Sequence, residues 1–171
     1  MDILAHGLWT NLAYFKKYQH HNKQRWLAVF FGVLPDLISF TPVTLYLFFR
    51  RSSFNFYDAL HSNLWVYQWA RESYNWTHSL VIFFIVAAII YGARKGRIYW
   101  PIWGWGFHIA LDVFTHKDFF QTPFLFPISG FKNHYAVRWS EPHFMFINYG
   151  ALAMVYLFLF YFAKKRNAKT G

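Results

Sequence analysis

Hydrophobic residues gather into five stretches separated by polar connections. The stretches cover residues 2–15, 27–49, 77–93, 98–115 and 144–163. A helix that spans a bilayer needs about 20 mostly apolar residues; the second and fifth stretches provide them, and the third and fourth reach that length by adding a turn. The first stretch is too short to span at about 1.5 Å per residue, so we expect it to insert partly and to pack against the others. The pattern predicts an all-α, polytopic membrane bundle of four to five hydrophobic helices, with residues 1–171 in a single domain.

The composition agrees with a membrane protein and limits the chemistry of any site. The 171 residues are 56% hydrophobic, 25% aromatic and only 14% charged, whereas roughly a quarter of the residues of a soluble domain are charged. The chain contains no cysteine. Disulfides and thiolate ligands are therefore excluded, and a bound metal must use His, carboxylate or backbone ligands.

The connections differ in the sign of their charges. Basic residues without any acidic residue follow the first, third and fifth stretches, whereas the connections 50–76 and 116–143 carry both signs. The basic positions are Lys16, Lys17, Lys23, Arg25, Arg94, Lys95, Arg97, Lys164, Lys165, Arg166 and Lys169. Basic, acid-free connections lie in the cytoplasm, which predicts an outer N-terminus and a cytoplasmic C-terminus. The net charge of +10 then indicates topology and attraction to membrane lipids, and we expect no nucleic-acid partner.

Ionisable residues inside the hydrophobic stretches are costly at membrane depth and tend to be functional. In the predicted orientation, the first four stretches bring such residues toward the same outer half. They are Asp2, His6, Asp36, His78, His108 and Asp112, with His116 just beyond the fourth stretch. Since Lys and Arg alone determine the orientation, this convergence is an independent observation.

Spacing and residue type suggest a metal site near the outer face. His108, Asp112 and His116 lie at i, i+4 and i+8, which places them in one stripe along a helix. His combined with carboxylate is a ligand set for zinc, with manganese or non-haem iron as alternatives. The set is larger than one four-coordinate ion needs, so one or two ions are expected. Two-metal sites activate water and hold phosphate oxygens.

Structural alternatives exist for each of these residues. A single His on an apolar helix is more often a hydrogen-bonded core residue than a ligand. Asp36 follows Pro35 and could serve a helix break or cap, and Asp112 could form a buried ion pair with a His. These alternatives predict a structural protein that binds no metal.

An ordered series of short segments extends from His6 to about Trp139. They are Gly32-Val33-Leu34-Pro35-Asp36, Thr77-His78-Ser79-Leu80, the segment 108–116 that reads HIALDVFTH, and the segment 122–129 that reads TPFLFPIS. This series resembles the membrane-bound metal-dependent hydrolases, a family of small bacterial and archaeal membrane proteins. That family is in turn similar to the zinc-dependent phospholipase C and single-strand nuclease enzymes, which are all-helical and cleave phosphate esters.

The resemblance implies particular ligands. The order of His and Asp in the phospholipase C and nuclease group falls on His6, Asp36, His78, His108 and Asp112 in this chain, and His116 is a looser match. Two positions depart from the family pattern. Ile38 stands where the membrane family often has a second acidic residue, and Met1 stands where the soluble enzymes have a tryptophan.

The resulting hypothesis is a membrane-embedded hydrolase that cleaves a phosphoester of a lipid or lipid-linked substrate. One ion is held by Asp36, His78, His108 and Asp112, and a second by His6 with His116 and a shared Asp112. Asp36, Asp112 and Asp2 are the expected catalytic carboxylates, Asp2 as a general base. Arg71, Arg138 and Lys132 are expected to bind the substrate phosphate. The alternative is a non-catalytic membrane protein that binds a metal or transports an ion.

Overall fold

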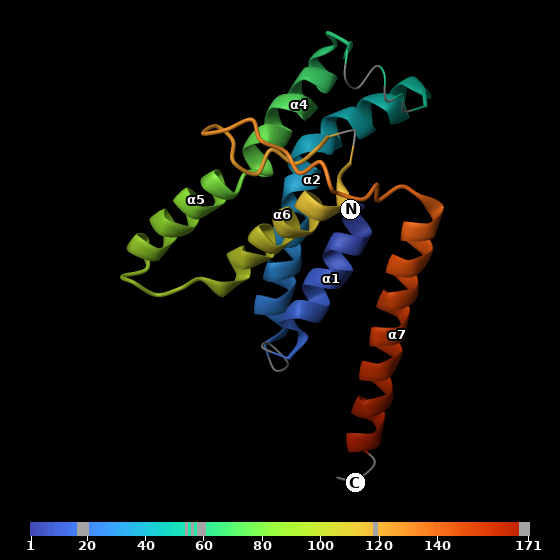
Figure 1. The fold of residues 1–171 in the computed structure, drawn as a ribbon. Helices are drawn as coiled ribbons and strands as arrows, with labels where there is room; N and C mark the ends of the chain where they lie inside the picture. Colours follow the sequence, from blue (N-terminus) through green and yellow to red (C-terminus); the bar gives the residue numbers. More distant parts are fainter. Residues whose placement is uncertain (17–20, 54, 56, 58–60, 118–119, 168–171) are drawn as a thin grey trace.

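The computed structural model describes residues 1–16, 21–53, 55, 57, 61–117 and 120–167, and Lys17 and Lys169 of the predicted basic connections lie outside this part. The described part is all-helical and has no strands (Figure 1). Its elements are α1 (Ile3–Phe15), α2 (Asn22–Arg50), α4 (Trp65–Thr77), α5 (Leu80–Ala93), the 3-10 helix η1 (Trp100–Ile102), α6 (Trp103–Thr115) and α7 (Pro142–Asn167). The predicted fold class is confirmed at this level.

Two of the described helices are long and apolar enough to cross a membrane, namely Asn22–Arg50 and Pro142–Tyr161. The pair α4 and α5 passes the same test as one element, but it is bent by 61° between the two helices. α1, α5 and α6 have 13 or 14 residues each, about 20 Å at 1.5 Å per residue, which is less than the roughly 30 Å of a bilayer core. By length and composition, the described part therefore has two or three candidate spans.

Helix α4 lies in a connection that the hydrophobic pattern assigned to no helix. Its buried residues are Val66, Tyr67, Ala70 and Tyr74. Three of these pack with Val43 of α2 in one core cluster. Because the other positions of α4 are polar or exposed, the helix is amphipathic, and its sequence contains too many polar residues to stand out as a membrane segment.

Helix α2 is the central element, with α1 and α6 against its first half and α4 against its second half (Figure 1). Two glycines permit very close helix contacts. A Cβ atom on Gly104 of α6 would lie 2.2 Å from the carbonyl oxygen of Ala28, and one on Gly32 of α2 would lie 2.4 Å from Thr10 Oγ1. Small residues at helix interfaces allow backbones to approach closely in membrane proteins. α2 also changes direction near its middle, where it contains prolines 35 and 42, a common cause of helix kinks.

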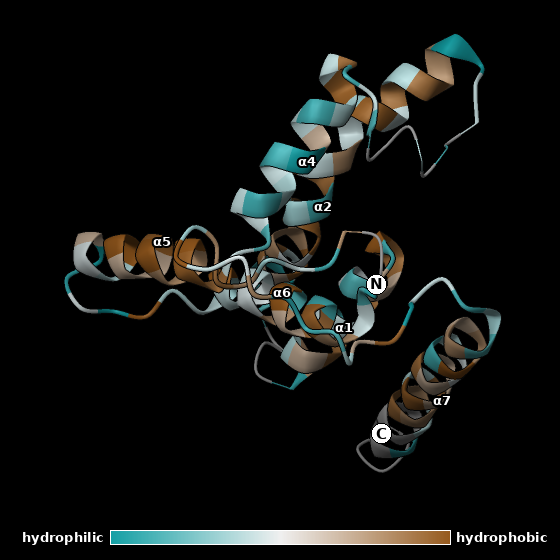
Figure 2. Ribbon diagram, turned by 45° about the horizontal axis from the view of Figure 1, so that its top comes forward, coloured by the Kyte–Doolittle hydropathy of each residue, from teal (hydrophilic) through white to brown (hydrophobic). Residues whose placement is uncertain are grey.

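Helices α5 and α7 expose hydrophobic surfaces. Figure 2 shows hydrophobic residues along both helices, whereas α4 carries hydrophilic ones. On α7, Phe146 is 82% exposed and Leu157 is 68% exposed, while Leu152 packs against Met1 and Ala5 at the start of the chain. Apolar surface of this extent on a long helix suits contact with lipid rather than water.

Candidate metal centre

Three parts of the chain bring four ionisable side chains together in the interior. Asp36 comes from the middle of α2, His78 from the break between α4 and α5, and His108 and Asp112 from α6. All four residues are buried, and one ligand atom from each lies within 4.8 Å of the other three. The prediction that these residues converge is confirmed, and this Asp/His cluster could hold a metal ion.

Local helix geometry places each member of the Asp/His cluster. His108 and Asp112 are four residues apart on α6, so they share one face of that helix. α4 ends at Thr77, and α5 begins after Ser79, whose Oγ accepts a hydrogen bond from the Ile82 N–H at 3.2 Å. His78 therefore lies in the bend between two helices.

Hydrogen bonds fix the orientation of the two imidazoles. His108 Nδ1 donates to the Gly32 carbonyl oxygen at 2.7 Å. His78 Nδ1 lies 3.0 Å from Thr77 Oγ1, and the Thr77 hydroxyl itself donates to the Ser73 carbonyl oxygen at 2.8 Å. Both Nδ1 atoms are thus donors, so both Nε2 atoms carry lone pairs in the neutral ring. These Nε2 atoms are only 3.0 Å apart and face two carboxylates, an arrangement that a cation would stabilise.

The carboxylate of Asp112 faces two pairs of histidines. Its Oδ2 lies 3.5 Å from His78 Nε2 and 3.2 Å from His108 Nε2, and it is buried without a hydrogen-bond partner in the structure. Its Oδ1 lies 2.9 Å from His6 Nε2 and 3.3 Å from His116 Nε2. A buried carboxylate oxygen without a donor is costly, and a metal ligand role would satisfy it.

His116 is also oriented for ligation. Its Nδ1 lies 3.2 Å from the Phe120 carbonyl oxygen, which can only accept, and 2.9 Å from the Tyr74 hydroxyl. Burial lowers the pKa of His116 to about 4, so the ring is neutral near pH 7 and its Nε2 is unprotonated. Nε2 lies 2.6 Å from the amino nitrogen of Met1, which also contacts the Asp112 carboxylate.

The other predicted site residues lie in different parts of the structure and have different contacts. Asp2 caps α1, since its Oδ1 accepts from the Ala5 N–H at 3.0 Å, and it also accepts from a tyrosine hydroxyl of α7 at 2.7 Å. Arg138 pairs through its backbone with His116 in an isolated β-bridge. Arg71, on α4, donates from Nη2 to the Ser62 carbonyl oxygen at 3.0 Å. The remaining predicted phosphate-binding residue, Lys132, is half-buried in the connection 116–143.

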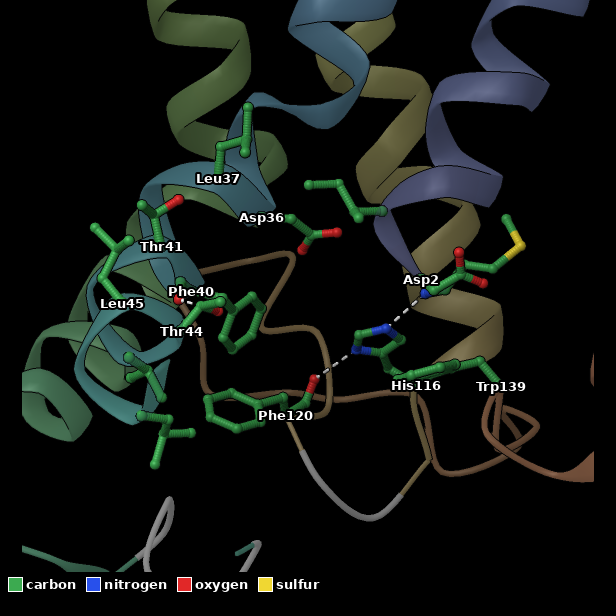
Figure 3. Close-up of a pocket in the computed structure, with 14 residues that line it drawn as sticks. Asp2, Asp36, Leu37, Phe40, Thr41, Thr44, Leu45, His116, Phe120 and Trp139 are labelled. Atoms are coloured by element: carbon green, nitrogen blue, oxygen red, sulfur yellow. Dashed lines mark hydrogen bonds between the residues drawn. The ribbon is translucent and has the colours of Figure 1, made fainter. Parts of the chain in front are cut away.

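A cavity of about 680 Å³ adjoins the Asp/His cluster. Asp36, Asp2 and His116 line it on the polar side, and Phe120 and Trp139 contribute from the connection 116–143 (Figure 3). The opposite wall is formed by the second half of α2. The hydrophobic pattern gave no sign of this cavity.

Sequence reasoning missed the residues that support the ligands. Tyr74 is fully buried, and its ring stacks on His78 with the centroids 3.7 Å apart. Ser39 Oγ lies 3.0 Å from Thr77 Oγ1 and continues the hydrogen-bond chain behind His78. The adjacent pair Thr77-His78 was the one sequence signal for this support.

The hydroxyl behind His78 should tune the affinity for a metal. Thr77→Val keeps the shape of the side chain and removes the acceptor for His78 Nδ1. Because hydrogen bonds to the second nitrogen of a ligating His orient the ring and raise its basicity, we expect zinc affinity to fall roughly 10- to 100-fold. Competition with a fluorescent chelator measures this change. Thr44→Val is the control, since the Thr44 hydroxyl bonds only its own helix at the Phe40 carbonyl; equal affinity of both variants would contradict the proposed support.

Comparison with known proteins returns no family model, no curated protein and no solved structure that matches the chain. The interpretation of the site therefore rests on its own geometry. Three properties favour a cation: four buried ligand atoms lie close together, two imidazoles direct their Nε2 atoms inward, and one carboxylate oxygen has no donor.

Proposed function

We propose that the protein is a membrane-embedded, metal-dependent hydrolase that cleaves a phosphoester of a lipid or lipid-linked substrate. The observation that carries this proposal is the buried Asp/His cluster, in which Asp36, His78, His108 and Asp112 offer ligand atoms within 4.8 Å of one another. The resemblance of the sequence motifs to the membrane-bound metal-dependent hydrolases supports the same class of activity. Buried ionisable groups in a membrane protein are usually functional.

We assign a first ion to the four residues of the Asp/His cluster. A second ion is assigned to His6, His116 and the Oδ1 atom of Asp112, which lies 2.9 Å from His6 Nε2 and 3.3 Å from His116 Nε2. Zinc suits this set of imidazoles and carboxylates best, and manganese or iron is also accepted by such ligands. When bound, such an ion lowers the pKa of a water ligand and polarises a phosphoryl oxygen.

The residues around the ions have separate tasks in this proposal. Asp2 lines the cavity and has one buried carboxylate oxygen without a hydrogen-bond donor, so it is the proposed proton acceptor. Arg138 is the predicted basic residue whose backbone pairs with His116, and it is the proposed partner of the substrate phosphate.

The proposed location is a bacterial or archaeal cell membrane, with several passes and a cytoplasmic C-terminus. The candidate spans support membrane insertion, and the basic connections support the orientation. The Asp/His cluster then faces the extracytoplasmic side. Lipid molecules of that side are the substrates that such a site would meet first.

Metal analysis followed by an activity assay tests the function. Detergent-purified wild type, His108→Ala and His61→Ala are compared by plasma mass spectrometry and by hydrolysis of bis-p-nitrophenyl phosphate. His61 is the control because it is exposed and bonds only a nearby backbone oxygen. We expect one or two equivalents of metal in wild type and in the control. In His108→Ala the metal should be lost and the rate should fall by more than about 100-fold, since a direct ligand matters more than its supporting residues.

Other outcomes lead to other functions. Bound metal without hydrolysis of any phosphoester would indicate the alternative, a non-catalytic membrane metal-binding or ion-transport protein. Wild-type protein that binds no metal, even after reconstitution with zinc, would contradict the proposal and leave a buried structural network.

A further inference from the structure

The cavity beside the Asp/His cluster has a polar end and an apolar wall. Asp2, Asp36 and His116 lie at the polar end (Figure 3). The apolar wall consists of Leu37, Phe40, Val43, Leu45, Leu47 and Phe120. The volume of the cavity, about 680 Å³, is within the range of roughly 300–1,000 Å³ that holds one drug-sized ligand. The cavity therefore suits an amphiphile of moderate size, with its polar head at the cluster.

The length of the apolar wall matches a hydrocarbon tail. Its α2 residues extend from Asp36 to Leu47, which covers about 16 Å at 1.5 Å per residue. Half of a bilayer core of about 30 Å is roughly 15 Å, which is the length that a tail occupies in one leaflet. The volume suits one such tail better than the two tails of a diacyl phospholipid.

The rim of the cavity indicates where this ligand comes from. Leu37 is 38% exposed and Leu45 is 50% exposed, and Thr44 between them is also exposed. These side chains lie on α2, a candidate membrane span. An apolar rim on such a helix would open toward lipid, so a ligand can enter sideways from the bilayer with its tail still in apolar surroundings.

We infer that this cavity binds the single hydrocarbon chain of a lipid phosphate, with the phosphate at the Asp/His cluster and the chain along the second half of α2. The inference rests on the proposed function for the phosphate end only. Asp2 and Asp36 are acidic and would repel a phosphate without a cation between them. Binding of the head therefore requires metal, whereas binding of the chain does not.

The test fills the cavity and measures binding of labelled single-chain probes. Full-length protein in nanodiscs of diacyl phosphatidylcholine is titrated with pyrene-labelled decyl phosphate and with pyrene-labelled decanol. Thr44→Trp places a large side chain in the cavity wall, and Thr41→Phe is a second filling variant in case the first does not fold. Phe48→Trp is the matched control, because Phe48 is 74% exposed on the same helix and does not line the cavity.

We expect both filling variants to bind both probes at least about tenfold more weakly than wild type, or by 1.4 kcal/mol. The affinity of the control should stay within about twofold of the wild-type value. His108→Ala should lose affinity for the phosphate probe alone, to the affinity of the alcohol or below it. If the hydrolase proposal fails and the protein binds no metal, the alcohol should still bind, and the filling variants should still weaken it. Equal binding by wild type and both filling variants would overturn the inference, as would equal competition by diacyl phosphatidic acid or by inorganic phosphate alone.

Discussion

Asp112→Asn is expected to abolish metal binding at both proposed positions while the fold is retained. The Asp112 carboxylate faces His78 and His108 with one oxygen and His6 and His116 with the other. The amide has the same shape but no charge, and its NH₂ group can donate to an unprotonated imidazole. The variant thus satisfies the neighbouring rings without a cation and removes the ligand that both ions share. We expect metal content below about one tenth of the wild-type value, which corresponds to at least tenfold weaker binding.

Glu72→Gln is the control for this prediction. It makes the same chemical change at an exposed position of α4 and should leave the metal content unchanged. Plasma mass spectrometry gives the stoichiometry, and circular dichroism in detergent reports the helical fold. Full metal content in Asp112→Asn would show that the ions bind elsewhere.

Gly104→Ala is expected to disrupt the packing of α6 on α2 more than any other single-methyl change. The new Cβ would lie 2.2 Å from the Ala28 carbonyl oxygen and 3.2 Å from the Gly32 backbone nitrogen. These are backbone atoms of a helix, so neither can move away as a flexible side chain would. Inserting a methyl group into a tight core costs typically about 1–3 kcal/mol, and we expect this contact to reach or exceed the upper value. Since α6 carries His108 and Asp112, metal binding should weaken together with stability.

Gly92→Ala provides the matched control on another apolar helix. A Cβ atom at Gly92 of α5 meets nothing within 4 Å, so alanine should be neutral or should stabilise the helix by up to about 1 kcal/mol. Thermal unfolding in detergent, followed by size-exclusion chromatography, measures both variants. A Gly104→Ala protein as stable as wild type would mean that the contact between α2 and α6 is looser than described.

The hydrophobic pattern predicted most of the helices because apolar segments of this length leave few alternatives. The stretches 2–15, 77–93, 98–115 and 144–163 each contain or largely overlap one described α-helix, with boundaries that differ by several residues. The stretch 27–49 lies within a longer α2, which begins in the polar connection before it and continues through both prolines. A proline disrupts a helix locally but need not end it.

The convergence of the ligands could be predicted because two independent arguments from the sequence agreed. The charges of the connections predicted a similar depth for His and Asp, and helical spacing predicted one face for His108 and Asp112. The supporting chain through Ser39 and Thr77 could not be predicted, because it joins two helices whose relative rotation depends on packing. The stacking of Tyr74 on His78 could not be predicted for the same reason. Nor could α4, because its apolar face can be recognised only from its contact with α2.

The cavity is a second feature that could not be predicted from the sequence. Most of its apolar wall comes from α2, and those residues were already part of a predicted hydrophobic segment. The sequence shows that these side chains avoid water, but it does not show whether protein or lipid covers them. Phe120 and Trp139 help to enclose the cavity, and they come from a connection that is distant in the sequence.

The members of the Asp/His cluster are far apart in the sequence, and this spacing gives a bound ion a mechanical role. Asp36, His78 and Asp112 belong to segments separated by long connections. An ion held by all three would close large loops in the chain, and closing large loops reduces the conformational entropy of the unfolded state most strongly. In a chain without cysteine, the ion would therefore be the cross-link of the fold, and loading could be completed only after α6 has been synthesised and packed.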